Sequence, residues 1–124
     1  KKRDFALLML LYGAGLRISE ALALTRAALP IGDWLRITGK GGKIREVPVL
    51  AAVAEAVADY VAFCPFDDGG DAPLFVSARG NALGVRAAQR LVEGLRVQLN
   101  LPSHVTPHAL RHAFATHLLG MIEL

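Results

Sequence analysis

Residues 34–47 read Trp34-Leu35-Arg36-Ile37-Thr38-Gly39-Lys40-Gly41-Gly42-Lys43-Ile44-Arg45-Glu46-Val47, and this stretch decides the fold class. Apolar and polar residues alternate on both sides of a glycine-rich centre. That pattern is typical of two antiparallel strands joined by a turn. We therefore predict strands over 34–38 and 43–47, with a hairpin tip at 39–42 that places Lys40 on a flexible turn.

The sequence on both sides of this hairpin favours helices. Residues 4–14 are apolar almost all round, which is typical of a buried helix. Ser19 can cap a second helix running to about Arg26, with Glu20 favourably placed in its first turn. The other expected elements are helices over 50–62 and 84–99, a short strand over 74–76 and a helix that begins at 106–107. The predicted fold is mainly α with a small β-hairpin sheet (α+β).

Composition and charge bound the class of protein. The chain has 124 residues, 53% of them apolar, which suits one packed domain and excludes a disordered chain. Its longest apolar run, Phe5 to Tyr12, is too short to cross a bilayer, and its single cysteine, Cys64, fits a reducing compartment. We therefore expect a cytoplasmic protein that does not enter a membrane.

Basic and acidic residues are segregated along the chain. Residues 1–50 carry nine Lys and Arg against four Asp and Glu, and residues 79–124 carry five against two. Residues 51–78 carry five acidic residues and no basic one. Such segregation favours a protein that presents one face to a polyanion such as nucleic acid.

Four residues have the chemistry of phosphoryl transfer. Arg17 lies in a tight link between two expected helices, Lys40 at the hairpin tip, and His108 and Arg111 on one face of the last expected helix. Guanidinium groups bind the non-bridging oxygens of a phosphate, and a lysine on a flexible turn can protonate a departing oxygen. No Asp/Glu cluster suited to magnesium accompanies them, so we predict metal-free transfer on a nucleic-acid backbone.

Simpler readings remain open for several of these side chains. Lys43 could be the active lysine in place of Lys40. His108 and His112 have the spacing of zinc ligands, but the sequence offers no third ligand, and His112 and His117 fit a packed core better. The residues predicted to contact DNA, some of which could equally be solvated, are Lys43, Arg45, Arg79, Arg86 and Arg90.

Three segments resemble the tyrosine recombinase (phage integrase) family, and within it the Xer-type, XerC-like sequences. They are residues 11–22, 38–48 and 106–119, which occur in the family's order and spacing, so the resemblance covers about residues 4–119. It implies the family's catalytic-domain fold, site-specific recombination of duplex DNA in chromosome segregation or integration, and no metal or cofactor. It also implies other recombinase protomers as partners in a synaptic tetramer.

The resemblance assigns a role to each candidate catalytic residue. Arg17 and Arg111 grip the scissile phosphate, and His108 assists proton transfer or positioning. Lys40 acts as the general acid to the 5′-hydroxyl leaving group. In the family a tyrosine attacks the phosphate to give a 3′-phosphotyrosyl link.

The nucleophile is where this chain departs from the family pattern. The family places its tyrosine a few tens of residues beyond the His-x-x-Arg pair, whereas Tyr12 and Tyr60 both lie upstream. We therefore expect residues 1–124 to be a partial catalytic domain without the N-terminal DNA-clamping domain and the C-terminal tyrosine segment, inactive alone. The alternatives are an inactive DNA-binding module and, more distantly, a metal-dependent phosphodiesterase.

Overall fold

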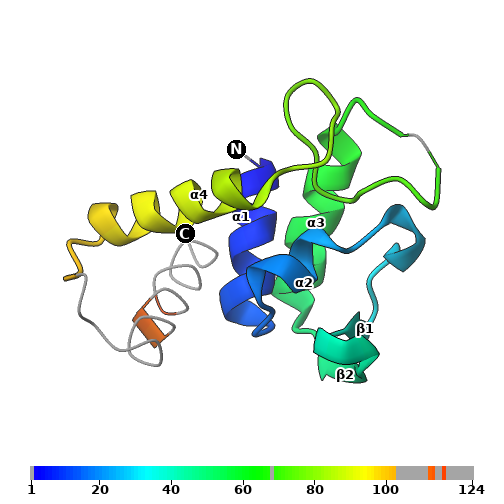
Figure 1. The fold of residues 1–124 in the computed structure, drawn as a ribbon, viewed down its shortest axis with the longest axis horizontal. Coiled ribbons are helices and arrows are strands. Elements are labelled where there is room, and N and C mark those ends of the chain that lie inside the picture. Colours follow the sequence, from blue (N-terminus) through cyan, green and yellow to red (C-terminus); the bar gives the residue numbers. More distant parts are fainter. Residues whose placement is uncertain (1, 68, 103–111, 114–115, 117–124) are drawn as a thin grey trace.

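The computed structural model describes residues 2–67, 69–102, 112, 113 and 116 (Figure 1). In this part the chain is mainly helical with one two-stranded antiparallel sheet, which confirms the predicted fold class. The elements in chain order are α1 (Lys2–Leu8), the π-helical turn η1 (Met9–Gly13), α2 (Ile18–Leu22), the 3-10 turn η2 (Arg26–Ala28), β1 (Trp34–Thr38), the 3-10 turn η3 (Lys40–Gly42), β2 (Ile44–Pro48), α3 (Ala51–Phe63) and α4 (Val85–Gln98).

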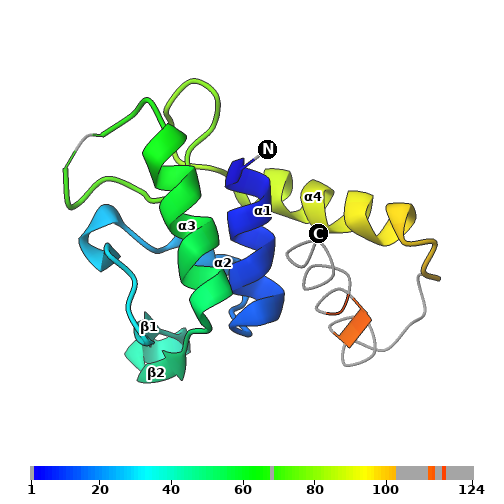
Figure 2. The same ribbon diagram turned by 180° about the vertical axis from the view of Figure 1, so that it is seen from behind.

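The centre of the core is the pair α1 and α3, which lie side by side in both views (Figures 1 and 2). Residues 6–11 are all buried, as the apolar sequence of 4–14 predicted, although the helix continues as a π-helical turn from Met9. Gly13 permits this close approach, because a Cβ there would lie 2.8 Å from a methyl carbon of Val53. The buried face of α3 recurs every three or four residues, at Val53, Ala56, Val57 and Tyr60.

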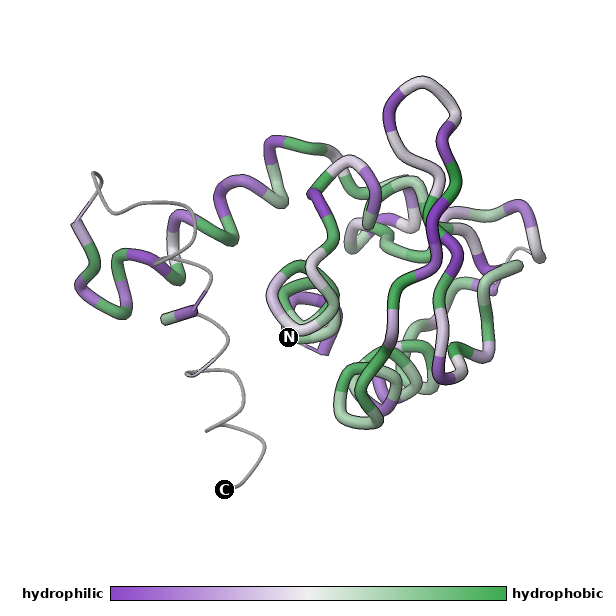
Figure 3. The backbone as a smooth tube through the Cα atoms, turned by 90° about the horizontal axis from the view of Figure 1, so that it is seen from below, coloured by the Kyte–Doolittle hydropathy of each residue, from purple (hydrophilic) through white to green (hydrophobic). Residues whose placement is uncertain are grey.

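The hairpin extends from this helical body at the start of α3. Its register pairs Ile37 with Arg45 and Thr38 with Ile44, so β2 starts one residue later than predicted. The Gly39 N–H donates to the Lys43 carbonyl at 2.7 Å and closes the tip. Gly41 and Gly42 have φ angles of 74° and 77°, a region that favours glycine. Figure 3 shows the hairpin reaching away from the helices, with hydrophilic residues at its tip.

The second helix differs from its prediction at both ends. Its N-cap is Arg17 and not Ser19, because the Glu20 side chain accepts the Arg17 N–H at 2.9 Å and supplies the capping bond from within the first turn. It ends at Leu22 and not near Arg26, since Thr25 pairs with Pro73 in an isolated bridge.

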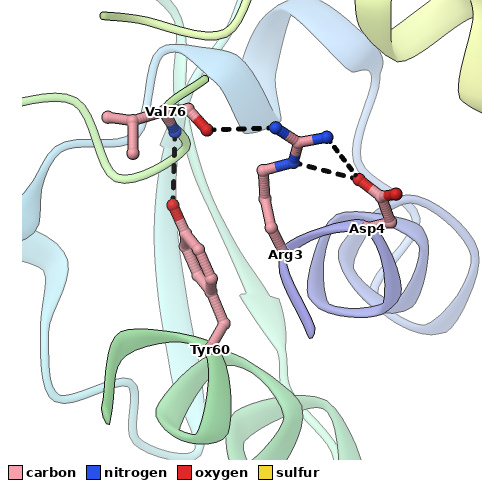
Figure 4. A network of polar contacts seen from close by, with 4 residues as sticks. All are labelled: Arg3, Asp4, Tyr60 and Val76. Atoms are coloured by element: carbon pink, nitrogen blue, oxygen red, sulfur yellow. Dashed lines mark hydrogen bonds and ion pairs between the residues drawn. The ribbon is translucent and has the colours of Figure 1, made fainter. Parts of the chain in front are cut away.

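Residues 74–76 form no strand in the described part of the chain, contrary to the prediction, and only Val76 takes part in an isolated antiparallel bridge, with Ala82. They are held by scattered bonds instead (Figure 4). The Tyr60 hydroxyl donates to the Leu74 carbonyl at 2.9 Å and accepts the Val76 N–H at 3.2 Å, while Arg3 donates to the Val76 carbonyl at 3.3 Å. The Tyr60 ring stacks on Phe75 with a centroid separation of 5.5 Å. This network joins α1, α3 and the 74–76 segment at the end of the molecule away from the hairpin (Figure 1).

Candidate functional site

Arg17 and Lys40 line one hollow of about 410 Å³ between α2 and the hairpin tip. The structure therefore places two of the four predicted catalytic residues on the same hollow. The other two, His108 and Arg111, lie outside the described residues. The remaining lining residues are Ser19, Glu20, Thr38 and Gly39.

A buried neighbour positions Arg17. Leu16 is buried in the core, and its N–H donates to the Leu10 carbonyl at 3.2 Å. Arg17 follows it with an extended backbone and caps α2, while its side chain is exposed. The chain thus uses the backbone of Arg17 to build the fold and leaves its guanidinium for the hollow.

Lys40 enters the hollow from the opposite side. It begins η3, directly after Gly39, and is exposed. Among the described residues, neither Arg17 nor Lys40 forms an ion pair through its side chain. Two unpaired cations on one hollow of this size favour an anionic ligand.

Glu20 is the buried charge of this region, with 8% of its side chain exposed. Arg45 binds it bidentately, with Nη1 at 2.6 Å from Oε2 and Nη2 at 3.0 Å from Oε1. The hydrogen bond from Arg45, aided by the Arg17 N–H and opposed by burial, lowers the pKa of Glu20 from 4.5 to about 2. The carboxylate is therefore ionised at neutral pH. Its hydrogen-bonded ion-pair partner is Arg45, and the positive charge of Arg17 nearby also lowers its pKa.

The Glu20–Arg45 pair is the part of the site that sequence reasoning missed, because it treated Arg45 as a DNA contact. Alternation along the hairpin contained no clear signal, because it favours apolar Ile44 on the core-facing side, whereas Ile44 is 62% exposed in the structure. Arg45 faces Ile37, a buried residue, so it occupies the core-facing side of β2. A charged residue on that side requires a partner of opposite charge, and Glu20 is the acidic residue that precedes the hairpin on α2.

The other predicted DNA contacts do not line the hollow. Lys43 is exposed beyond the tip, Arg79 is exposed in the loop that follows residue 76, and Arg86 and Arg90 are exposed on α4. His112, which was expected to pack in the core, is exposed. His117 lies outside the described residues.

Neither a metal centre nor a membrane span is found in the described residues. No group of three or more His, Cys, Asp and Glu side chains is placed there to hold a metal ion. In the same part of the chain, no helix is both long and apolar enough to cross a bilayer.

Acid should destabilise the chain through Glu20. A carboxyl whose pKa falls to about 2 on folding stabilises the folded state above its unfolded pKa of 4.5, and this contribution is lost as the pH falls toward 2. Its size at pH 7 is at most about 3 kcal/mol, because water around the half-exposed Arg45 screens the pair, and more than half of it disappears by pH 3. Urea unfolding at both pH values measures this loss.

The control for this prediction is Glu20→Gln, which removes the titrating group and keeps a similar shape. The variant should be less stable at pH 7 and should lose less stability on acidification. Parallel pH profiles for the two proteins would contradict the role assigned to Glu20.

The sequence of this chain is similar to those of several known proteins. A model of the phage integrase family matches residues 1–121. The tyrosine recombinase XerC of Rhodospirillum centenum is 59% identical over 119 residues, which cover 95% of this chain and 35% of that protein. XerC of Methylobacterium sp. (strain 4-46) is 56% identical over 120 residues, covering 95% and 38%. The chain thus spans little more than a third of the length of these curated relatives.

Two solved structures share the fold. The crystal structure of XerA recombinase matches with a TM-score of 0.71 and 26% identity over 96% of this chain and 43% of that one. The XerH site-specific recombinase, bound to its palindromic difH substrate in a post-cleavage complex, matches with a TM-score of 0.71 and 26% identity over 99% and 36%. The family match includes the stretches that contain Arg17 and Lys40, and also His108 and Arg111.

Proposed function

The chain belongs to the phage integrase family, as its motifs predicted, and from that premise we propose that it is part of the catalytic domain of a site-specific DNA recombinase. In this proposal the hollow between α2 and the hairpin tip holds the scissile phosphate. The observation that supports it is that Arg17 and Lys40, far apart in the sequence, line the same hollow without ion-pair partners among the described residues.

The proposed reaction is an exchange of phosphodiester bonds. A tyrosine oxygen attacks the phosphorus, the bond from phosphorus to the 5′ oxygen breaks, and a 3′-phosphotyrosyl link forms. Arg17 stabilises the charge on the non-bridging oxygens, and Lys40 gives its proton to the departing 5′ oxygen. Arg111 and His108 complete the phosphate site in the proposal. The number of phosphodiester-type bonds is unchanged, so religation needs no cofactor.

The attacking tyrosine is proposed to come from outside residues 1–124. Tyr60 is unsuited, because its hydroxyl is already engaged by Leu74 and Val76 and burial raises its pKa. Tyr60 also lies nine residues after Ala51, the first residue of α3 and the end nearest the hairpin, which corresponds to a distance of about 13 Å along the helix axis. Tyr12 is half-buried in η1. The isolated chain is therefore proposed to engage DNA without cleaving it.

A second candidate function is DNA binding without any cleavage. The observation that favours it is the set of exposed basic side chains away from the hollow, Lys43, Arg79, Arg86 and Arg90. The solved XerH relative is bound to DNA. The two candidates agree that this chain contacts duplex DNA and differ in whether a longer protein containing it forms the covalent link.

Binding of the isolated chain to a labelled DNA duplex tests the part that both candidates share. If about four phosphates are contacted, the affinity should fall on the order of 100-fold between 50 and 200 mM salt. Arg86→Gln combined with Arg90→Gln should weaken binding and flatten the salt dependence. Arg96→Gln is the matched control, because Arg96 on the same helix is paired with Glu93. A DNA affinity that does not change with salt concentration would contradict both candidates.

Trapping on nicked suicide DNA separates the two candidates. The longer protein proposed to contain this chain should form a covalent adduct with the nicked duplex, whereas the isolated chain should form none. If the longer protein binds the duplex tightly and yields no adduct, the binding function is favoured.

A further inference from the structure

We propose that Arg45 is a positioning residue, whose ion pair with buried Glu20 holds the hairpin that carries Lys40 against the segment that carries Arg17. The inference deepens the proposed function and rests on it, because it concerns the same phosphate site. It also gives Arg45 a different role from the DNA contact predicted from the sequence.

One carboxylate joins the two sides of the hollow. Its Oε1 atom accepts the backbone N–H of Arg17 at 2.9 Å and also the Nη2 group of Arg45 at 3.0 Å. Its Oε2 atom accepts Nη1 of Arg45 at 2.6 Å. A bidentate arginine–carboxylate pair fixes both distance and orientation. The position of β2 is thereby tied to the residue that caps α2.

The pair lies next to the residue that precedes Lys40. A Cβ built on Gly39 would lie 3.4 Å from Oε2 of Glu20 and 3.6 Å from Nη1 of Arg45. The backbone of Gly39 is therefore in near contact with the ion pair. Because Lys40 follows directly, a shift of Arg45 relative to Glu20 displaces the start of η3 and the lysine with it.

Few other contacts could hold this end of the hairpin in place. The core-facing apolar residues of the two strands are Leu35, Ile37 and Val47, and only Ile37 is near the tip. Residues 40–46 are all exposed. A two-stranded hairpin is only marginally stable alone, so its tip depends on contacts with the helical body.

The geometry differs from that of an ordinary surface ion pair. Glu20 is 8% exposed and Arg45 is 44% exposed, so the pair is partly shielded from water. Exposed pairs contribute little to stability, whereas removing one partner of a buried pair leaves an uncompensated charge. A positioning role and a purely structural role therefore both predict some loss of stability, and the test needs a readout specific to Lys40.

That readout is the identity of the leaving group. When the scissile 5′ oxygen is replaced by sulfur, the leaving group departs as a thiolate and needs little help from a general acid. A defect that acts through Lys40 should shrink on the sulfur substrate. A defect in folding or in phosphate binding should be equal on both substrates.

The experiment measures single-turnover cleavage of the two DNA substrates by the longer protein proposed to contain this chain. Arg45→Ala should lower cleavage of the oxygen substrate on the order of 10²-fold, as expected for misplacement of a catalytic group. Cleavage of the sulfur substrate should be within about 10-fold of the unsubstituted protein. Arg45→Lys, which keeps the charge without the bidentate fork, should have an intermediate defect and tests the same point if the alanine variant does not fold.

Arg36→Ala is the matched control, because Arg36 lies opposite Glu46 in the strand register, on the solvent-facing side of the same hairpin. It should leave the ratio of the two cleavage rates unchanged. Equal losses on both substrates for the Arg45 variants, or no loss on either, overturn the positioning role while the proposed function stands. Failure of the unsubstituted protein to cleave either substrate overturns the proposed function and this inference together.

Discussion

Replacing Arg17 with alanine is expected to lower the rate of DNA cleavage on the order of 10²–10³-fold and to leave the fold intact. The size follows from the loss of one preorganised donor to the charge that develops on the phosphoryl oxygens. The fold should survive because Glu20 binds the backbone N–H of residue 17, which alanine retains. Single-turnover cleavage and urea unfolding of the same preparation measure the two quantities.

The Arg17 defect should be insensitive to the leaving group. Arg17 acts on the non-bridging oxygens, so the sulfur-containing substrate should be cleaved as poorly as the normal one. Arg17→Lys keeps a positive charge without the planar fork and should recover only part of the rate. If the alanine variant unfolds, Arg17 is a structural residue. If the variant folds and cleaves at the unchanged rate, Arg17 does not stabilise the scissile phosphate.

Local patterns in the sequence were enough to predict most of the elements. Uniform apolarity over residues 4–14 indicated a buried helix, and alternation around residues 39–42 indicated the hairpin. Both predictions depend on periodicity within one short segment, and the structure confirms both. The glycines between the two alternating segments also predicted a turn that contains Lys40. In the structure Gly41 and Gly42 have positive φ angles at this turn, and Lys40 is exposed.

The rest of the site depends on contacts between distant segments. Ser19 was predicted to cap α2, but the cap is at Arg17. The side chain of Glu20, three residues after Arg17, accepts the hydrogen bond from the Arg17 N–H. The Glu20–Arg45 pair joins residues 25 apart in the sequence. No periodicity within either segment predicts this contact, and the core-facing position of Arg45 follows only from the strand register of the structure.

The same register separates two functions among the basic residues of the hairpin. Arg45 is 44% exposed but binds Glu20, whereas Lys40 and Lys43, at and beyond the tip, form no ion pair among the described residues. Charge counting along the sequence treats these three side chains alike. The fold uses one of them to hold the hairpin and leaves the other two available to an anion, which is why the lysines have to be separated by experiment.

Lys40→Ala is expected to lower cleavage of an ordinary DNA duplex on the order of 10²–10⁴-fold, the usual contribution of a general acid. An alkoxide is a poor leaving group, and Lys40 is the residue proposed to protonate it. The sulfur-containing substrate should be cleaved at nearly the normal rate, because a thiolate leaves without protonation. Single-turnover measurements on both substrates give the rescue ratio. This is the rate of the variant relative to the unsubstituted protein on the sulfur substrate, divided by the same relative rate on the ordinary substrate.

Lys43→Ala is the control that separates the two lysines of the tip. Lys43 lies beyond η3 and does not line the hollow, so its loss should weaken DNA binding slightly and leave the rescue ratio at one. If Lys43→Ala is rescued by sulfur and Lys40→Ala is not, the general acid is Lys43. The tip must then rearrange on DNA, because Lys43 does not line the hollow in this structure.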